Sequence, residues 1–138
     1  LRLNPEKIDD ALIEANRLDP AVTFIFRVAN TDFNYCGQDI KKGDAVFISS
    51  HAINRDPHVF ADPNGFNINN SKLHAKNYSF GYGKHFCLGS KVAMLQMRLT
   101  LSSLLGRYKS IAVDQANSHR AHESLAFSGF HSLALITE

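Results

Sequence analysis

The chain has 138 residues, of which 44% are apolar and 20% are charged, and its formal net charge is +2. These values are typical of one ordinary globular domain, which buries about two thirds of the surface of its unfolded chain. So small a charge gives no reason to expect binding to nucleic acid or to a membrane surface. The sequence has no apolar run of about 18 residues, so it predicts no transmembrane helix.

The N-terminal residues and the cysteine content indicate where the protein acts. The first ten residues, LRLNPEKIDD, contain no apolar signal core, so secretion is not indicated. Cys36 and Cys87 are too few for a disulfide scaffold and fit a reducing compartment. We therefore expect a cytoplasmic protein. The first residue is Leu1 rather than Met, which favours a fragment or a processed chain.

Residues 4–18 predict the first main helix. Asn4 is a favourable N-cap residue, and Pro5 suits the first helical position. Apolar residues recur at helical spacing and form one stripe, namely Ile8, Ala11, Leu12, Ala15 and Leu18. The dipeptide at 19–20, Asp-Pro, ends the helix.

Residues 22–49 predict a small antiparallel sheet. β-Branched and aromatic residues at 22–28, around 33–35 and at 45–49 are typical of short strands, and strands so close in sequence pair antiparallel more readily than parallel. The next segment, 51–79, has no sustained period and is rich in Asn, Pro, Asp and Gly. A long irregular segment in a small domain is usually functional or held against other parts of the fold.

Residues 90–106 predict the second main helix. Apolar residues cover most of its circumference, so we expect this helix in a core. Lys91 and Arg98 are seven residues apart and share its one charged flank. The remaining residues, 109–138, predict short strands.

The stretch FGYGKHFCLGS, residues 80–90, contains a cysteine with several possible roles. Free cysteines are usually buried and inert, and for an isolated Cys87 this interpretation stands. The surroundings favour a ligand instead, because the helix beginning near Ser90 directs its positive end towards the sulfur and favours a thiolate. The backbone also has glycines that allow close approach to a flat molecule, namely Gly81, Gly83 and Gly89.

Zinc binding and nucleophilic catalysis are two alternatives. A structural zinc site needs four ligands, usually in pairs, whereas His85 and Cys87 form no second pair and Cys36 is distant in sequence. A cysteine–histidine nucleophile needs a hydrogen bond between the two side chains. Side chains two apart in an extended loop point to opposite sides, which works against that bond. Haem ligation is the remaining interpretation.

The spacing of five residues in this loop carries a resemblance to a known family. Phe80, Gly83, His85, Cys87 and Gly89 match the cysteine-loop signature of the cytochrome P450 family, which is a specific motif. The chain therefore resembles a family member. The resemblance implies the C-terminal, haem-ligating part of the cytochrome P450 fold, which is mainly α with a small antiparallel β-sheet.

Further segments match the same family along essentially the whole chain, 1–138, as a single C-terminal portion. Glu14 and Arg17 look like the Glu-x-x-Arg pair of the family's K helix, and Arg27 lies where bacterial members place an arginine for a haem propionate. The stretch after the first helix and the last strands also resemble the family, at residues 54–57, Phe60 and residues 129–133.

The resemblance implies a role for each residue of the cysteine loop, 80–89. Cys87 would be the catalytic proximal thiolate ligand of the iron of haem b (iron protoporphyrin IX), since an anionic sulfur favours O–O cleavage. Arg27 and His85 would bind the haem propionates. The other cofactor-binding positions would be Phe80, which packs over the proximal haem face, and Gly81 and Gly89.

Glu14 and Arg17 would be a structural pair, buried behind the haem, that holds the cysteine loop in place. Relatives have an arginine as the third member of this cluster, in the irregular segment. In this sequence Gly65 stands at that position, and the neighbouring Asn64 is the substitute we consider.

The implied function is that of a haem-thiolate monooxygenase, which inserts one oxygen atom of O₂ into a small organic substrate. Electrons would come from a ferredoxin- or flavodoxin-type donor, for which Lys84, Lys91 and Arg98 form a possible docking surface. The helices of the distal pocket would come from an N-terminal complementing chain. A truncated, non-catalytic haem-binding or interaction module is the alternative, and a peroxide-driven relative shares the same signature.

Overall fold

The computed structural model describes residues 1–70, 76–121 and 124–138, and its first main element is the predicted helix. A 3₁₀ turn, η1 (Pro5–Lys7), leads into α1 (Ile8–Leu18). Asn4 is the N-cap residue of this 3₁₀ turn and Pro5 its first residue, as predicted, but the side chain of Asn4 makes no capping hydrogen bond. The tight first turn moves the start of the α-helix to a later residue than the sequence indicated.

The buried face of α1 is apolar in its first half and charged in its second. Most of the predicted apolar stripe is buried, namely Ile8, Ala11 and Leu12. Ala15, however, is exposed, and the buried face continues through Glu14 and Arg17, each with 0% of its surface exposed. An apolar pattern does not predict this, because charged side chains are assigned to the solvent side unless they are paired.

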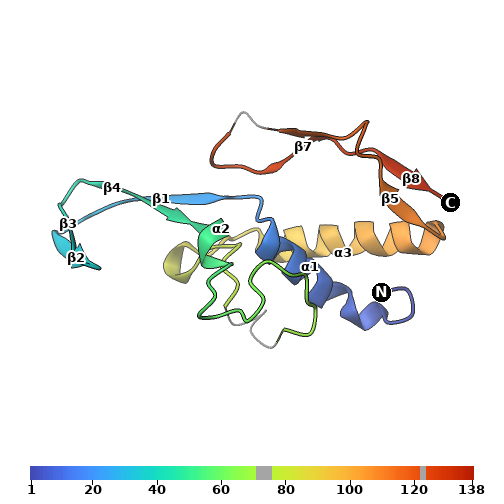
Figure 1. Ribbon diagram of the computed structural model, residues 1–138, viewed down its shortest axis with the longest axis horizontal. Coiled ribbons are helices and arrows are strands. Elements are labelled where there is room, and N and C mark those ends of the chain that lie inside the picture. Colours follow the sequence, from blue (N-terminus) through green and yellow to red (C-terminus); the bar gives the residue numbers. More distant parts are fainter. Residues whose placement is uncertain (71–75, 122–123) are drawn as a thin grey trace.

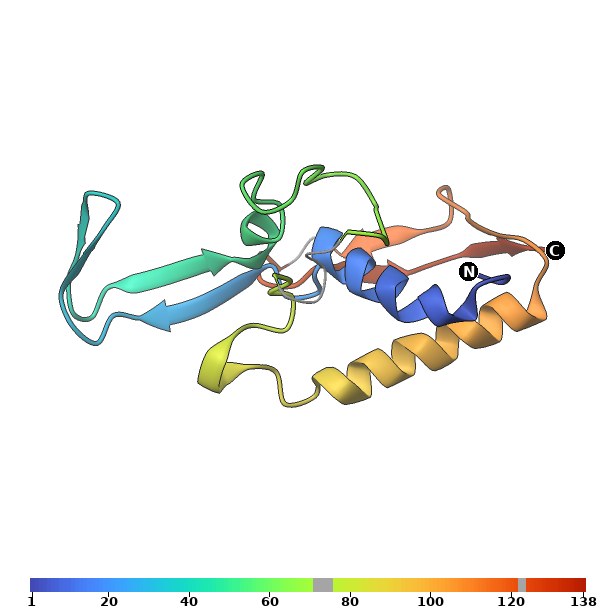
Figure 2. The ribbon, with the colours of Figure 1, turned by 90° about the horizontal axis from the view of Figure 1, so that it is seen from below.

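A long antiparallel ladder extends away from α1. β1 (Phe24–Val28) pairs with β4 (Ala45–Ser49), and both views show the ladder running outward from the two main helices (Figures 1 and 2). A hairpin of β2 (Phe33–Tyr35) and β3 (Gln38–Ile40) lies at its outer end. The predicted antiparallel β-structure is confirmed, although β3 was not predicted as a separate strand.

The segment after β4 is irregular, as predicted, apart from one short helix. α2 (Ser50–Ile53) begins after Ser49, whose side-chain oxygen accepts a hydrogen bond from the N–H of Ala52 at 3.1 Å. From Asn54 to Tyr82 the described residues form neither helix nor strand. Residues 71–75, which the sequence places in the same irregular segment, lie outside the described residues.

The second main helix, α3 (Ser90–Arg107), lies beside α1 (Figure 2). It passes through Gly106, which was predicted to end it. The expectation that α3 lies in a core is wrong for this chain, because three of its apolar side chains are more than half exposed: Val92 (61%), Leu95 (53%) and Leu99 (60%). None of the described helices is long and apolar enough to cross a membrane.

Short strands form the C-terminal part of the chain, as predicted. In the described residues β5 pairs with β8 and β6 pairs with β7, over Ile111–Val113, Leu135–Thr137, His119–Ala121 and Gly129–Ser132 respectively. The carboxylate of Asp19, at the end of α1, accepts hydrogen bonds from Arg120 and from the hydroxyl of Ser128. These bonds fix the C-terminal strands to the first helix.

Candidate functional site

The cysteine loop, residues 80–89, folds back on itself before α3 begins. Gly81 and Gly83 have φ angles of 78° and 66°, a region that glycine adopts without steric cost. Gly83–His85 form a 3₁₀ turn, η2. The N–H of Cys87 donates to the carbonyl of Phe80 at 2.9 Å and closes the loop. The backbone therefore holds the cysteine at a defined place.

The sulfur of Cys87 lies beside the N-terminus of α3. Gly89 is the N-cap of that helix, and the N–H of Ser90 donates to the carbonyl of Cys87 at 3.3 Å. The cysteine is exposed. A β-carbon at position 89 would lie 4.0 Å from the sulfur, an ordinary contact distance, so the start of the helix lies close to the sulfur. The N-terminus of a helix carries a partial positive charge, and the cysteine lies at this end of α3.

A cavity of about 340 Å³ lies beside the cysteine. It gathers five of the six positions predicted to hold a cofactor, namely Arg27, Phe80, Gly81, His85 and Cys87. The sixth, Gly89, does not line it. His85 and Cys87 both line this cavity. His85 is the last residue of the 3₁₀ turn, and the backbone of Phe86 between the two residues is extended, with φ −54° and ψ 140°.

Two nitrogen-bearing side chains reach this cavity from different elements. Arg27 comes from β1 and His85 from η2, and both are exposed. One N–H of Arg27 donates to the carbonyl of Phe26 at 2.7 Å. A cavity with a cysteine and two such groups at its margin is chemically suited to a ligand that combines a metal with carboxylates.

Glu14 and Arg17 form a buried ion pair behind the loop. Nε and Nη2 of Arg17 donate to the two carboxylate oxygens of Glu14 at 2.6 and 2.8 Å, and both side chains are fully buried. The other guanidinium hydrogens are donated to backbone carbonyls, those of Asn54 and Pro63 at 2.8 Å and that of Gly65 at 2.9 Å. All five N–H groups of this guanidinium therefore have acceptors.

Main-chain atoms complete the cluster where an arginine was expected by resemblance. The N–H of Asn67 donates to Glu14 at 2.8 Å, while the carbonyl of Gly65 accepts from the arginine. Asn64, the substitute considered from sequence, is not among the contacts of the pair; the carbonyls on either side of it are. A β-carbon at position 65 would lie 1.8 Å from the carboxylate of Asp62, which accepts the N–H of Gly65 at 2.9 Å.

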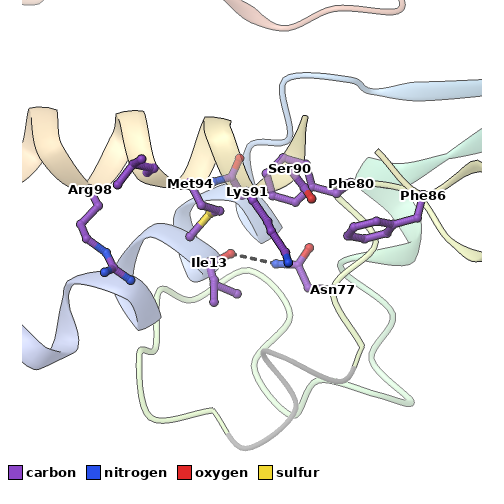
Figure 3. A pocket seen from close by; sticks show the side chains of 10 residues that line it. Ile13, Asn77, Phe80, Phe86, Ser90, Lys91, Met94 and Arg98 are labelled. Atoms are coloured by element: carbon purple, nitrogen blue, oxygen red, sulfur yellow. Dashed lines mark hydrogen bonds between the residues drawn. The ribbon is translucent and has the colours of Figure 1, made fainter. Parts of the chain in front are cut away.

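Two of the three predicted docking residues lie together. Lys91 and Arg98 line a second cavity, of about 420 Å³, between α1 and α3 (Figure 3). Lys84, in η2, does not line it. Arg98 donates from Nε to the carboxylate of Asp9 at 2.7 Å, so its charge is already paired with α1. Phe80 and Asn16 line both cavities, so the two cavities are neighbours.

The described residues offer no cluster for a structural zinc ion. Across residues 1–70, 76–121 and 124–138, no group of three or more His, Cys, Asp or Glu side chains is placed to hold a metal ion. Cys36 cannot serve as a second cysteine ligand beside Cys87, since it is a free cysteine in the outer hairpin.

Several polar residues that connect α1 with the cysteine loop had no predicted role. They are Asn16, Asn54, Asn77 and Ser79, and each makes a side-chain hydrogen bond. Asn54 belongs to the stretch at 54–57 that carried part of the resemblance, and this was the one signal in the sequence. The others lie in segments whose composition predicts only irregular structure.

Comparisons with known proteins agree with this geometry. The family described as Cytochrome P450 matches residues 8–129. The biotin biosynthesis cytochrome P450 of Bacillus subtilis is 38% identical over 111 residues, and the polyketide biosynthesis cytochrome P450 PksS of the same species is 41% identical over 112 residues. Each alignment covers 80% of this chain but only 28% and 27% of the respective relative.

Solved structures give the same result. P450BioI in complex with an acyl carrier protein ligated to hexadec-9Z-enoic acid matches with a TM-score of 0.91 and 33% identity, covering 100% of this chain and 35% of that chain. PksS of Bacillus subtilis matches with a TM-score of 0.88 and 35% identity, covering 98% of this chain and 35% of that chain. The chain thus spans about a third of each solved relative and belongs to the cytochrome P450 family.

Proposed function

We propose that this chain is the haem-ligating part of a haem-thiolate monooxygenase that inserts one oxygen atom of O₂ into a small organic substrate. The observation that supports this most directly is the cavity shared by Cys87, His85 and Arg27. Haem b bound there would supply the chemistry of O₂ activation, with electrons from a redox partner. Substrate selection would depend on parts of the relatives that this chain does not span.

The lining of the cavity fits haem chemically. Cys87 provides a soft anionic donor for iron, and Arg27 and His85 provide partners for carboxylates. The walls are largely apolar, with Val22, Ile25 and Phe80 among them, as a porphyrin face requires. Gly81 has no side chain to project into the cavity, and its φ of 78° is one that glycine adopts without steric cost.

The protein's own contribution would be to hold the sulfur in place. The N–H groups of Leu88 and Gly89, just before α3 begins, would hydrogen-bond the iron-bound sulfur. Phe80 would form part of the wall on the side of α1 and α3, because it lines both cavities. Water would then have restricted access to the sulfur from that side.

Arg27 gives a test of the cofactor site that is separate from the iron ligand. We expect Arg27→Ala to weaken haem binding about tenfold, because a charge-assisted hydrogen bond to a propionate is lost. The haem affinity of Arg27→Lys should lie between those of Arg27→Ala and the wild type, since a lysine keeps the positive charge but not the planar guanidinium. The measurement is the rate of haem transfer to an excess of apo-globin.

The control for this prediction is Arg107→Ala, which removes an exposed arginine at the far end of α3. Its haem transfer rate should equal that of the wild type. A transfer rate for Arg27→Ala indistinguishable from the control would show that this arginine is not a propionate partner.

We further propose that a polypeptide corresponding to the remaining length of the relatives covers α3. The exposed apolar side chains of this helix are the supporting observation, because a face of this kind is unfavourable in water. This favours a complemented enzyme over the isolated haem-binding or interaction module. An intact mass of the purified material shows whether a companion polypeptide accompanies the chain; its absence from a folded, haem-loaded preparation would favour the module.

Lys84 and Lys91 are the remaining candidates for docking an acidic electron donor. Arg98 is left out because its guanidinium pairs with Asp9. We expect the double variant Lys84→Glu/Lys91→Glu to slow reduction by the donor strongly at low salt and little at high salt. The reason is that exposed charges act on the association rate and are screened beyond ~8–10 Å at ordinary ionic strength.

The matched control is Lys42→Glu, which reverses a charge in the turn before β4, at the outer end of the long ladder. Stopped-flow reduction rates measured over a range of salt concentrations distinguish the two variants. If the double variant and the control are reduced equally fast at low salt, the docking surface lies elsewhere.

A further inference from the structure

Asn54 is fully buried and uses every polar group that the structure describes for it. Its backbone carbonyl accepts from Arg17 at 2.8 Å. Its side-chain oxygen accepts from the N–H of Tyr78 at 2.8 Å, and its side-chain nitrogen donates to the hydroxyl of Ser79 at 2.9 Å. One residue therefore joins the buried ion pair to the segment that leads into the cysteine loop.

The segment that receives these bonds is also fixed to α1. The hydroxyl of Ser79 lies 2.7 Å from the carbonyl of Asn16 and 2.6 Å from the side-chain oxygen of Asn77, and it donates its single hydrogen to one of them. Asn77 donates to the carbonyl of Ile13 at 2.8 Å, the dashed bond in Figure 3. Residues 77–79 are thus held between α1 and Asn54.

Two backbone bonds carry this placement to the cysteine. The N–H of Gly81 donates to the carbonyl of Tyr78, and the N–H of Cys87 donates to the carbonyl of Phe80, both at 2.9 Å. Successive hydrogen bonds therefore connect Arg17 to Asn54, Asn54 to Tyr78 and Tyr78 to Gly81. Phe80, the residue before Gly81, is bonded in turn to the N–H of Cys87.

We propose that Asn54 is a positioning residue for the cysteine loop and, with Ser79 as its side-chain partner, sets where the sulfur of Cys87 lies. This rests on the proposed function, because the loop is taken to hold an iron ligand. A neutral amide is suited to this position because it donates and accepts at once, which a buried carboxylate or an apolar side chain of the same size does not do. An unsatisfied N–H of Tyr78 would otherwise be left in a half-buried position.

The test uses hydrogen exchange on the intact chain without added haem. Asn54→Ala and Ser79→Ala should speed amide exchange at residues 77–87 about tenfold, the effect of losing one buried hydrogen bond. Exchange in β1 and in the middle of α3 should stay at the wild-type rate. Asn54→Asp keeps an acceptor for the N–H of Tyr78 and should restore part of the protection.

The matched control is Asn34→Ala in the outer hairpin. Asn34 also accepts from a backbone N–H, that of Gly37, and donates to a side chain, that of Asp39. It should leave residues 77–87 unchanged. If Asn54→Ala does not fold, Ser79→Ala decides the matter, since it removes only a hydroxyl. Equal acceleration along the whole chain, or unchanged exchange at 77–87, would overturn the proposal.

A second measurement links the network to the ligand. With haem bound, Ser79→Ala should lose the red-shifted Soret band of its ferrous carbon monoxide complex several times faster than the wild type, and a wild-type rate would overturn the link. The exchange result does not depend on haem. Failure of the proposed haem ligation in a Cys87 variant would therefore be distinguishable from failure of this positioning role.

Discussion

Replacing Cys87 with Ser should abolish the red-shifted Soret band that thiolate-ligated ferrous haem gives with carbon monoxide. A serine hydroxyl at neutral pH is not an anionic sulfur donor, so the electron density that the thiolate provides is lost. Arg27, His85 and Phe80 remain in the cavity of this variant. We therefore expect haem to bind more weakly, with an unshifted spectrum, rather than to be excluded. The measurement is a difference spectrum of the reduced protein with and without carbon monoxide.

The chain contains its own control for this prediction. Cys36 is also a free, exposed cysteine, but it lies in the hairpin turn at the outer end of the long ladder. Cys36→Ser should keep the red-shifted band at full intensity. If the band survives in Cys87→Ser, or if it disappears in Cys36→Ser alone, Cys87 is not the iron ligand and the proposed function fails.

Glu14→Ala should lose the folded protein rather than slow its turnover. Removing one partner of a buried ion pair typically costs ~3–5 kcal/mol, because the other charge stays buried without compensation. The free energy of unfolding of a whole domain is only about 5–15 kcal/mol. Arg17 has three backbone partners besides Glu14, so the irregular segment that contains Pro63 and Gly65 loses its anchor as well. Denaturant unfolding followed by circular dichroism measures the loss.

A matched variant removes an ion pair of the same type at an exposed place. Asp9→Ala breaks the pair with Arg98, in which both side chains are partly exposed. Surface pairs contribute ~0–1 kcal/mol, so this protein should unfold at nearly the wild-type denaturant concentration. Wild-type stability in Glu14→Ala together with reduced turnover would mean that the pair acts in catalysis and not in folding.

Local sequence signals predicted most of the regular elements and missed the exact ends of several. The helical spacing of Ile8, Ala11 and Leu12 placed α1, and the apolar run from residue 90 placed α3. The predicted start of α1 was three residues too early, because the sequence pattern at Pro5–Lys7 suits the first turn of a 3₁₀ helix as well as that of an α-helix. The short helix α2 was missed because four residues are too few to show a period.

The candidate site followed from the sequence through the spacing of the loop residues and, for Arg27, through the family resemblance. Ten residues of one loop contain the glycines, His85 and Cys87. Residues so close in sequence stay together wherever the loop lies in the fold. Arg27 is far from them in sequence, and only the approach of β1 to the cysteine loop brings it to the same cavity. The antiparallel arrangement of that strand with β4 was predicted, but the position of the strand beside the cysteine loop was not.

The sequence by itself determined the cysteine loop, the two main helices and the family to which they belong, because these depend on residues near one another in the chain. The tertiary structure alone decided how the buried charges are satisfied. Arg17 finds its acceptors at Asn54, Pro63 and Gly65, residues that lie 37 to 48 positions further along. A backbone carbonyl is present at every residue and leaves no trace in the sequence, so only the folded chain shows which carbonyls accept the hydrogen bonds of Arg17.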